Sequence, residues 1–350
     1  MKRLMLLRKV YVKLTNWEYW PMEAIYLPIF GYWIYLGVKA RSLFFFSAAN
    51  PLIENAGFAM ERKSLIYQSM PKSSYPNTIL ARLGASEGEL LALMKSANLQ
   101  FPIIAKPDVG QRGIQVKLIH NQKELSSYAD QIFTAFLLQE YISYPNEVGI
   151  FYYRIPGEKR GKISGIVGKE FMEVTGDGIS TLRQLIIKNT RYLFQLNTLE
   201  KLMGKALEQI LEIGERKVFE PYGNHCRGAL FLDLGELITD GLTQMIDNLC
   251  VQIPEFYFGR LDIKYNTWDE LCEGKNYVVI ELNGAGSEPT HIYDPKHSIW
   301  FAWKELIRHW NILYRISMAN RKNNGLQLMG FREGMTLIRN NSDYVKLIAQ

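Results

Sequence analysis

Short apolar or alternating runs, typical of strands, are mixed along the chain with amphipathic stretches typical of helices. The predicted strands cover residues 101–107, 113–119, 135–142, 146–155, 161–174, 228–234, 258–265 and 275–283. The predicted helices cover residues 60–70, 86–99, 121–132, 182–189, 199–213, 242–253 and 297–317, and only a tail is expected beyond about 320. Because strands and helices do not alternate strictly, the pattern favours α+β lobes over a doubly wound sheet.

The composition is that of a packed globular protein. Of the 350 residues, 47% are hydrophobic and 22% are charged, as in chains that bury a core. The three cysteines, Cys226, Cys250 and Cys272, are scattered, with no CxxC pair and no histidine-rich companion. This spacing argues against a zinc site or a disulfide framework, and it predicts a reducing, cytoplasmic location.

The amino-terminal segment is aromatic and basic. Residues 1–45 contain seven lysines and arginines but only two glutamates. Such a segment is either a solvated tail or a contact for an anionic surface, which leaves peripheral binding to the inner face of a membrane open. A nucleic-acid partner is not expected, because the basic residues are interleaved with apolar ones and no recognition motif occurs.

Residues 24–38 are uncharged, but 15 residues are too few for a bilayer span, and Pro28 and Gly31 weaken a helix there. An interfacial segment and a helix packed on the protein body both fit this stretch.

An acid and an amide end the apolar run at residues 278–283. Side chains alternate across a strand, so Glu281 and Asn283 share a face. If strands 258–265 and 275–283 pair as an antiparallel hairpin, Asp262 lies opposite Glu281. Two carboxylates and an amide oxygen suit Mg²⁺, with Mn²⁺ as an alternative ion, and Mg²⁺ held by few protein ligands usually takes substrate phosphates as well. An ordinary exposed hairpin face would show the same residues.

A phosphate site is predicted after the strand at 101–107. Lys106 ends this strand, and Gly110 and Gly113 follow in the next loop. Glycines let backbone N–H groups close around phosphate oxygens, and the lysine adds a positive charge. A Gly-x-x-Gly pair alone is usually a β-turn, but Lys-Pro-Asp-x-Gly-x-x-Gly after an apolar strand is a much narrower pattern.

These motifs together resemble the ATP-grasp superfamily of carboxylate–amine ligases, in its D-alanine–D-alanine ligase-like and cyanophycin synthetase-like branch. Lys106 with its glycine loop is followed in order by LLQEYI (137–142), NEVG (146–149), GRLDIKY (259–265) and VVIELN (278–283). The resemblance covers roughly residues 60–310. It implies an α+β ATP-grasp fold, in which two α+β lobes sandwich ATP beneath a mobile glycine loop.

The resemblance implies five divisions of the chain. A short aromatic appendage (1–60) precedes a lead-in segment (61–100), a small lobe with the glycine loop (101–145), a large lobe with the metal site (146–315) and a carboxy-terminal tail (316–350).

The resemblance also assigns roles to individual residues. ATP would contact Lys106 through its phosphates and Glu147 through its ribose, with the adenine beside Gln139, Glu140, Tyr141 and Ile142. Lys63 is expected as a second phosphate lysine, with Arg62 and Lys72 as competitors for that role. Arg260 would stabilise the transferring phosphoryl group and the tetrahedral intermediate. Asp262, Glu281 and Asn283 would be the metal ligands.

A narrower similarity, to cyanophycin synthetase and ATP-grasp glutamate–cysteine ligases, lies at VTGDGISTLRQLI (174–186). The basic loop with His225 and Arg227 resembles one in ATP-grasp peptide ligases, where Arg227 would hold an acyl phosphate or a substrate carboxylate. Two departures argue against D-alanine as the substrate. Pro289 comes six residues after Asn283 rather than three, and residues 1–60 are too short for the domain that usually precedes this fold.

The implied reaction is an ATP- and Mg²⁺-dependent ligation. A small-molecule or peptide carboxylate would become an acyl phosphate, with release of ADP, and an amine would then form the amide. Two alternatives stay open: a small-molecule kinase that stops at phosphate transfer, and a membrane-surface protein that binds ATP without ligase activity.

Overall fold

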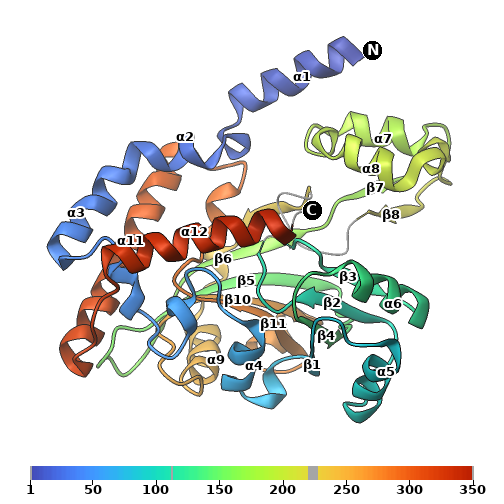
Figure 1. Cartoon of the computed structure of the whole chain (residues 1–350). Coiled ribbons are helices and arrows are strands. Elements are labelled where there is room, and N and C mark those ends of the chain that lie inside the picture. Colours follow the sequence, from blue (N-terminus) through green and yellow to red (C-terminus); the bar gives the residue numbers. More distant parts are fainter. Residues whose placement is uncertain (1, 112, 220–227, 349–350) are drawn as a thin grey trace. The chain divides into compact units, whose positions relative to one another are not determined.

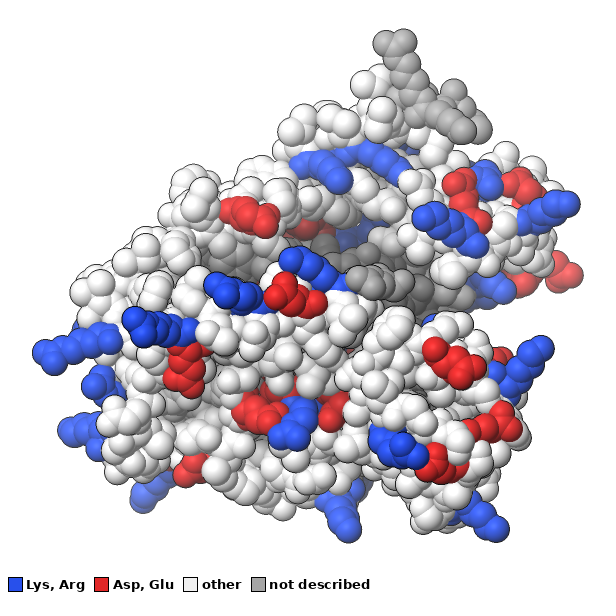
Figure 2. Space-filling model, in the orientation of Figure 1, with Lys and Arg blue, Asp and Glu red and all other residues white. Residues whose placement is uncertain are grey.

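The computed structural model describes residues 2–111, 113–219 and 228–348. The chain forms two compact units. The first unit comprises Met1–Phe30, Val167–Asp233 and Thr290–Lys304, and the second comprises Gly31–Ile166, Leu234–Pro289 and Glu305–Gln350. Figure 1 shows their elements, and Figure 2 shows acidic and basic side chains interspersed over one face. Within the described residues, no helix combines the length and apolar content that a bilayer span requires.

The second unit contains a four-stranded antiparallel sheet in the order β1-β4-β2-β3. Its strands are β1 (Thr78–Ala81), β2 (Ile103–Pro107), β3 (Lys117–Ile119) and β4 (Phe136–Glu140). Helices α5 (Glu87–Ser96) and α6 (Gln122–Gln131) pack on it through Leu90 and Leu125 (Figure 1). Ser86 caps α5 in a reciprocal pair with Glu89, three residues later, which is the spacing of a capping box.

A second sheet of this unit runs in the order β11-β10-β5-β6. Its strands are β5 (Asn146–Tyr153), β6 (Lys162–Glu170), β10 (Phe258–Tyr265) and β11 (Tyr277–Asn283). Helices α4 (Lys63–Ser69) and α9 (Asp240–Cys250) contribute Ile66 and Ile246 to the core beneath these strands. The short helix α10 (Trp268–Cys272) lies in the connection between β10 and β11.

Aromatic residues build a third core in the second unit. Phe45 and Phe46 pack among α3 (Phe30–Ala40), α11 (Ile299–Asn324) and α12 (Phe331–Ile348). Leu36 and Gly37 of α3 are buried, so part of residues 24–38 is a helix packed on the protein body. The prediction of only a tail beyond about 320 is wrong, because residues 331–348 form α12.

The first unit contains helices α1 (Lys2–Thr15), α2 (Met22–Tyr26), α7 (Leu182–Lys188) and α8 (Leu196–Met203). The second half of β6 pairs with β9 (Leu230–Asp233), and β7 (Glu173–Thr175) pairs with β8 (Arg216–Val218). The helix predicted at 199–213 is wrong in its extent. Gly204 follows α8 with a positive φ of 51°, a conformation that ends a helix, and a 3-10 turn comes next.

One predicted strand is also shorter than expected. Of residues 113–119 only Lys117–Ile119 are extended. Residues 113–116 form a turn in which Val116 donates its N–H to the Gly113 carbonyl, and Gln115 has a φ of 57°. The glycine loop is therefore longer than the alternating pattern indicated.

Candidate active site

The paired ends of β10 and β11 carry the central acidic residues. Asp262 lies opposite Glu281 and Arg260 opposite Asn283, so the register predicted from the hairpin is confirmed. A bulge follows Asp262, where the pairing shifts by one residue. Bulges near functional sites change the direction of side chains, and this one lies directly after the acidic pair.

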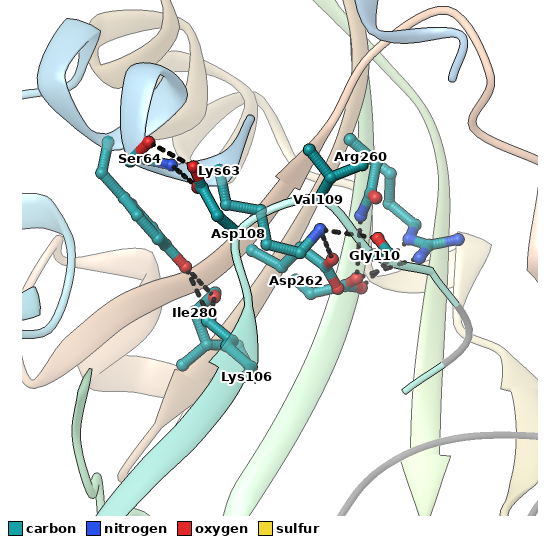
Figure 3. A network of polar contacts seen from close by, with 12 residues as sticks. Lys63, Ser64, Lys106, Asp108, Val109, Gly110, Arg260, Asp262 and Ile280 are labelled. Carbon is teal, nitrogen blue, oxygen red and sulfur yellow. Dashed lines mark hydrogen bonds and ion pairs between the residues drawn. The ribbon is translucent and has the colours of Figure 1, made fainter. Parts of the chain in front are cut away.

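Asp262 is almost fully buried, with 2% of its surface exposed. Arg260 binds both of its carboxylate oxygens, Nε to Oδ1 at 3.0 Å and Nη2 to Oδ2 at 2.9 Å, as Figure 3 shows. Burial alone would lower the pKa of Arg260, but the Asp262 carboxylate beside it raises that pKa above its usual value. The pair is the planar two-point contact that a guanidinium makes best.

Glu281 pairs with Lys63 from the first turn of α4. The Lys63 Nζ atom lies 2.8 Å from Glu281 Oε1 and also donates to the Gly110 carbonyl at 3.1 Å. Burial opposes charge on both side chains, yet each holds the other ionised. The pKa of Lys63 is raised by Glu281, and the pKa of Glu281 is lowered by Lys63, Lys106 and Arg260.

The donor set fits a hard divalent cation. Asn283 Nδ2 lies 3.3 Å from Asp262 Oδ2, so two carboxylates and one amide converge here. Within the described residues, no three or more His, Cys, Asp or Glu side chains are grouped so that they could hold a metal ion by themselves, so the amide oxygen would be needed as a third protein ligand. Because its nitrogen faces Asp262, the Asn283 amide would have to turn for its oxygen to serve.

Lys106, the next-to-last residue of β2, is buried and has three oxygen acceptors. Its Nζ atom donates to the Tyr67 hydroxyl and the Gln139 Oε1 atom, both at 2.9 Å. It also donates to the carbonyl of Ile280 at 3.2 Å, and Figure 3 labels both Lys106 and Ile280. Among the residues that the structure describes, no carboxylate forms an ion pair with Lys106. Burial lowers the pKa of Lys106 to about 7, against the opposing attraction of Glu281. The side-chain oxygen of Gln139, which was expected beside the adenine, therefore accepts a hydrogen bond from Lys106.

Asp108 positions Lys63 and was not singled out from the sequence. Its carboxylate accepts the Ser64 backbone N–H at 2.8 Å and the Ser64 hydroxyl at 2.9 Å, and its carbonyl accepts the Lys63 N–H (Figure 3). Arg62 precedes α4 without a side-chain cap, so Asp108 caps the helix from a distant part of the chain. The aspartate of Lys-Pro-Asp was the only available signal, and it does not reveal this partner.

Helix α12 contacts the glycine loop. Tyr344 donates its hydroxyl to the Val109 carbonyl at 2.6 Å, and the Gln111 side chain lies 3.4 Å from Asn341 Oδ1. Ile348, one turn beyond Tyr344, is 1% exposed. The loop that begins with Asp108 and Val109 is therefore held by the helix that replaces the expected tail.

The remaining predicted residues are distributed as follows. Glu140 is exposed at the end of β4 and bonds Asn77, while Glu147 is buried on β5 opposite Lys264. Tyr141 and Ile142 follow β4 and are partly exposed, and Gly113 adopts a positive φ of 69°. Arg227 and the neighbouring His225 lie outside the described residues. Of the three candidates for the second phosphate lysine, Arg62 pairs with Glu54 and Lys72 is exposed, which leaves Lys63 at the cluster.

Residues 63–158 match the family model of the RimK-like ATP-grasp domain. The chain thus carries an ATP-grasp domain with an α+β fold, and both predictions are confirmed. A curated relative is the glutathione biosynthesis bifunctional protein of Streptococcus mutans, 24% identical over 258 residues, which cover 67% of this chain and 33% of that protein.

Two solved structures resemble the chain more distantly. One is a bifunctional glutathione synthetase from Pasteurella multocida (13% identity, TM-score 0.39, covering 70% of this chain and 36% of that one). The other is a D-alanine–D-alanine ligase from Bacillus anthracis (14% identity, TM-score 0.44, covering 80% and 73%). The chain spans about a third of the length of the two glutathione proteins.

Proposed function

We propose that the protein is an ATP- and Mg²⁺-dependent ligase that activates a substrate carboxylate as an acyl phosphate and joins it to an amine. The observation that carries this proposal is the cluster of opposite charges next to the glycine loop. Lys63 and Arg260 lie against the carboxylates of Glu281 and Asp262, within or beside the segment that matches an ATP-grasp domain. ATP-dependent amide formation is the reaction expected of such a domain.

The cluster is arranged for an exchange of partners. Each carboxylate now has a cation beside it, so neither is buried without a partner. When Mg²⁺ enters with ATP, Asp262, Glu281 and Asn283 would hold the metal, which neutralises charge on the phosphates. Lys63 and Arg260 would then be released to bind phosphate oxygens in place of carboxylate oxygens. Every charge keeps a partner of opposite sign throughout.

The chain's own residues divide the remaining work. Lys106 would add positive charge at the phosphates, and the backbone N–H groups near Gly110 and Gly113 would close around their oxygens. Arg260, freed from Asp262, would neutralise the phosphoryl group as the substrate carboxylate attacks it. The acyl carbon would then accept the amine, with loss of phosphate, and exclusion of water would protect the acyl phosphate from hydrolysis.

The first experiment measures ADP release from Mg·ATP with a panel of amino acids and short peptides, with and without an amine acceptor. The panel includes the amino acids of glutathione, because a relative is a glutathione biosynthesis protein. ADP and an amide formed only when both substrates are present would support the ligase. A phosphorylated product formed without an amine would identify the kinase alternative instead.

Two variants test the assignment of the metal ligands. Asp262→Asn and Glu281→Gln keep the size of each side chain but remove its charge, so turnover should be abolished while the far-ultraviolet circular dichroism spectrum is unchanged. Full activity in either variant would refute the metal assignment without deciding the reaction class.

A further inference from the structure

Helix α1 is held on the first unit by one side. Arg8 donates from Nη1 to the Ile187 carbonyl at 2.9 Å and from Nη2 to the Thr190 hydroxyl at 3.0 Å. Val12 is 5% exposed, and Met5 packs against the hydrophobic core built around α7 and α8. Residues 5, 8 and 12 recur at helical spacing, so they define one docked face.

The opposite face of α1 is apolar and exposed. At about 100° per residue, Leu7, Val10 and Leu14 lie roughly opposite Val12, and Tyr11 lies at one edge of this face. Tyr11 is 68% and Leu14 71% exposed, and the exposed apolar side chains of α1 together are Leu6, Leu7, Val10, Tyr11 and Leu14. Isolated exposed apolar residues are normal on a protein surface, but five on a single helix form a contiguous patch.

The charge of α1 indicates what covers this patch. The helix contains five basic residues and no acidic one, and Lys9 and Lys13 lie along one edge of the apolar face. A second copy of the chain would bring the same positive charges together, which disfavours self-association. An anionic bilayer offers both partners at once, acyl chains for the apolar side chains and headgroups for the lysines.

We infer that α1 is a membrane-surface helix that lies in the headgroup region of an anionic bilayer, with Leu7, Val10 and Leu14 directed toward the acyl chains. The docked face of α1 contacts the rest of the first unit, and the exposed face is the opposite one, so membrane binding does not require α1 to detach. A helix with so few apolar residues binds neutral lipid weakly, so attachment depends on anionic headgroups. This inference does not depend on the reaction that the active site performs.

The test is co-sedimentation of the full-length protein with vesicles of phosphatidylcholine alone or of phosphatidylcholine and phosphatidylglycerol at three to one. The expected result is binding to the anionic vesicles that falls at least tenfold on the neutral ones and weakens with added salt. Equal partitioning into both kinds of vesicle, or no binding to the anionic vesicles, would overturn the inference.

Two matched variants distinguish the contribution of α1 to vesicle binding from that of exposed apolar residues in general. The double variant Leu7→Glu, Leu14→Glu should lose at least tenfold in partitioning into anionic vesicles. The control, Ile179→Glu, Ile213→Glu, makes the same changes at residues of the first unit that are 81% and 84% exposed but outside α1. Both proteins should keep the wild-type circular dichroism spectrum. Equal losses in the two variants, or a wild-type dimer that only the α1 variant disrupts, would contradict a lipid partner.

Discussion

Replacement of Asp108 by alanine should weaken nucleotide binding, although the proposed function gives Asp108 no contact with the phosphates. The carboxylate is 4% exposed and caps α4 through the Ser64 N–H and hydroxyl. Loss of the cap on the Ser64 N–H costs about 1 kcal/mol, and the Ser64 hydroxyl left unpaired adds roughly 1–3 kcal/mol. The free energy of unfolding should therefore fall by about 2–4 kcal/mol.

The same change should also displace Lys63, because Lys63 directly precedes Ser64 in the first turn of α4 and that turn loses its cap. The Lys63 N–H bond to the backbone carbonyl of residue 108 does not involve the side chain, so it cannot replace the lost cap. A charge-assisted contact between Lys63 and phosphate is worth roughly 1.5–3 kcal/mol, so the Kd for ATP should rise about tenfold to a hundredfold. Urea unfolding followed by circular dichroism measures the first effect, and isothermal titration calorimetry with Mg·ATP measures the second.

Asp247→Ala is the matched control. Asp247 is also buried and accepts two hydrogen bonds, from the Tyr152 hydroxyl at 2.7 Å and the Gly161 N–H at 2.9 Å. The Asp247→Ala variant should lose a similar free energy of unfolding but keep the wild-type affinity for ATP. The reasoning fails if Asp108→Ala unfolds at the wild-type urea concentration, or if both variants lose ATP affinity equally.

Three further predictions concern the same site. Because burial lowers the pKa of Lys106 to about 7, the folded chain binds fewer protons than the unfolded chain between pH 7 and the usual lysine pKa. The free energy of unfolding should thus rise with pH in this window, by up to about 1.4 kcal/mol per pH unit, and urea midpoints should show no such rise in Lys106→Met. Tyr344→Phe removes the bond to the Val109 carbonyl, worth about 1 kcal/mol, so hydrogen exchange of the loop amides should accelerate severalfold, and unchanged exchange would count against the contact. Arg260→Lys keeps the charge but not the two-point contact, so kcat should fall by roughly 10²-fold in the ADP assay while circular dichroism stays the same.

Local patterns predicted the parts of this site that depend on neighbouring residues. The hairpin of residues 258–283 has a register that its own alternation specifies, so the placement of Asp262 opposite Glu281 was readable in advance. Ser86 and Glu89 stand three residues apart, the spacing of a capping box, so the cap of α5 also depends only on local sequence. Both features need only a few residues of context.

The features that the sequence did not reveal join distant parts of the chain. The cap of α4 comes from Asp108, 44 residues away from Ser64, and no spacing rule connects them. Residues 331–348 are amphipathic, but the polar stretch and glycines that precede them concealed the helix. Even a correct helix assignment would not have placed Tyr344 beside Val109, because that contact depends on how the intervening elements fold.

The bond between Tyr344 and Val109 joins residues 235 positions apart. Natural selection therefore has two separate places at which to adjust how long a nucleotide stays bound. Under the proposed function, substitutions in the glycine loop itself alter groups that would meet the phosphates, and most of them would harm the chemistry. Substitutions along α12 change only the support of the loop, so residence time can drift in small steps while the residues that handle the phosphates remain untouched.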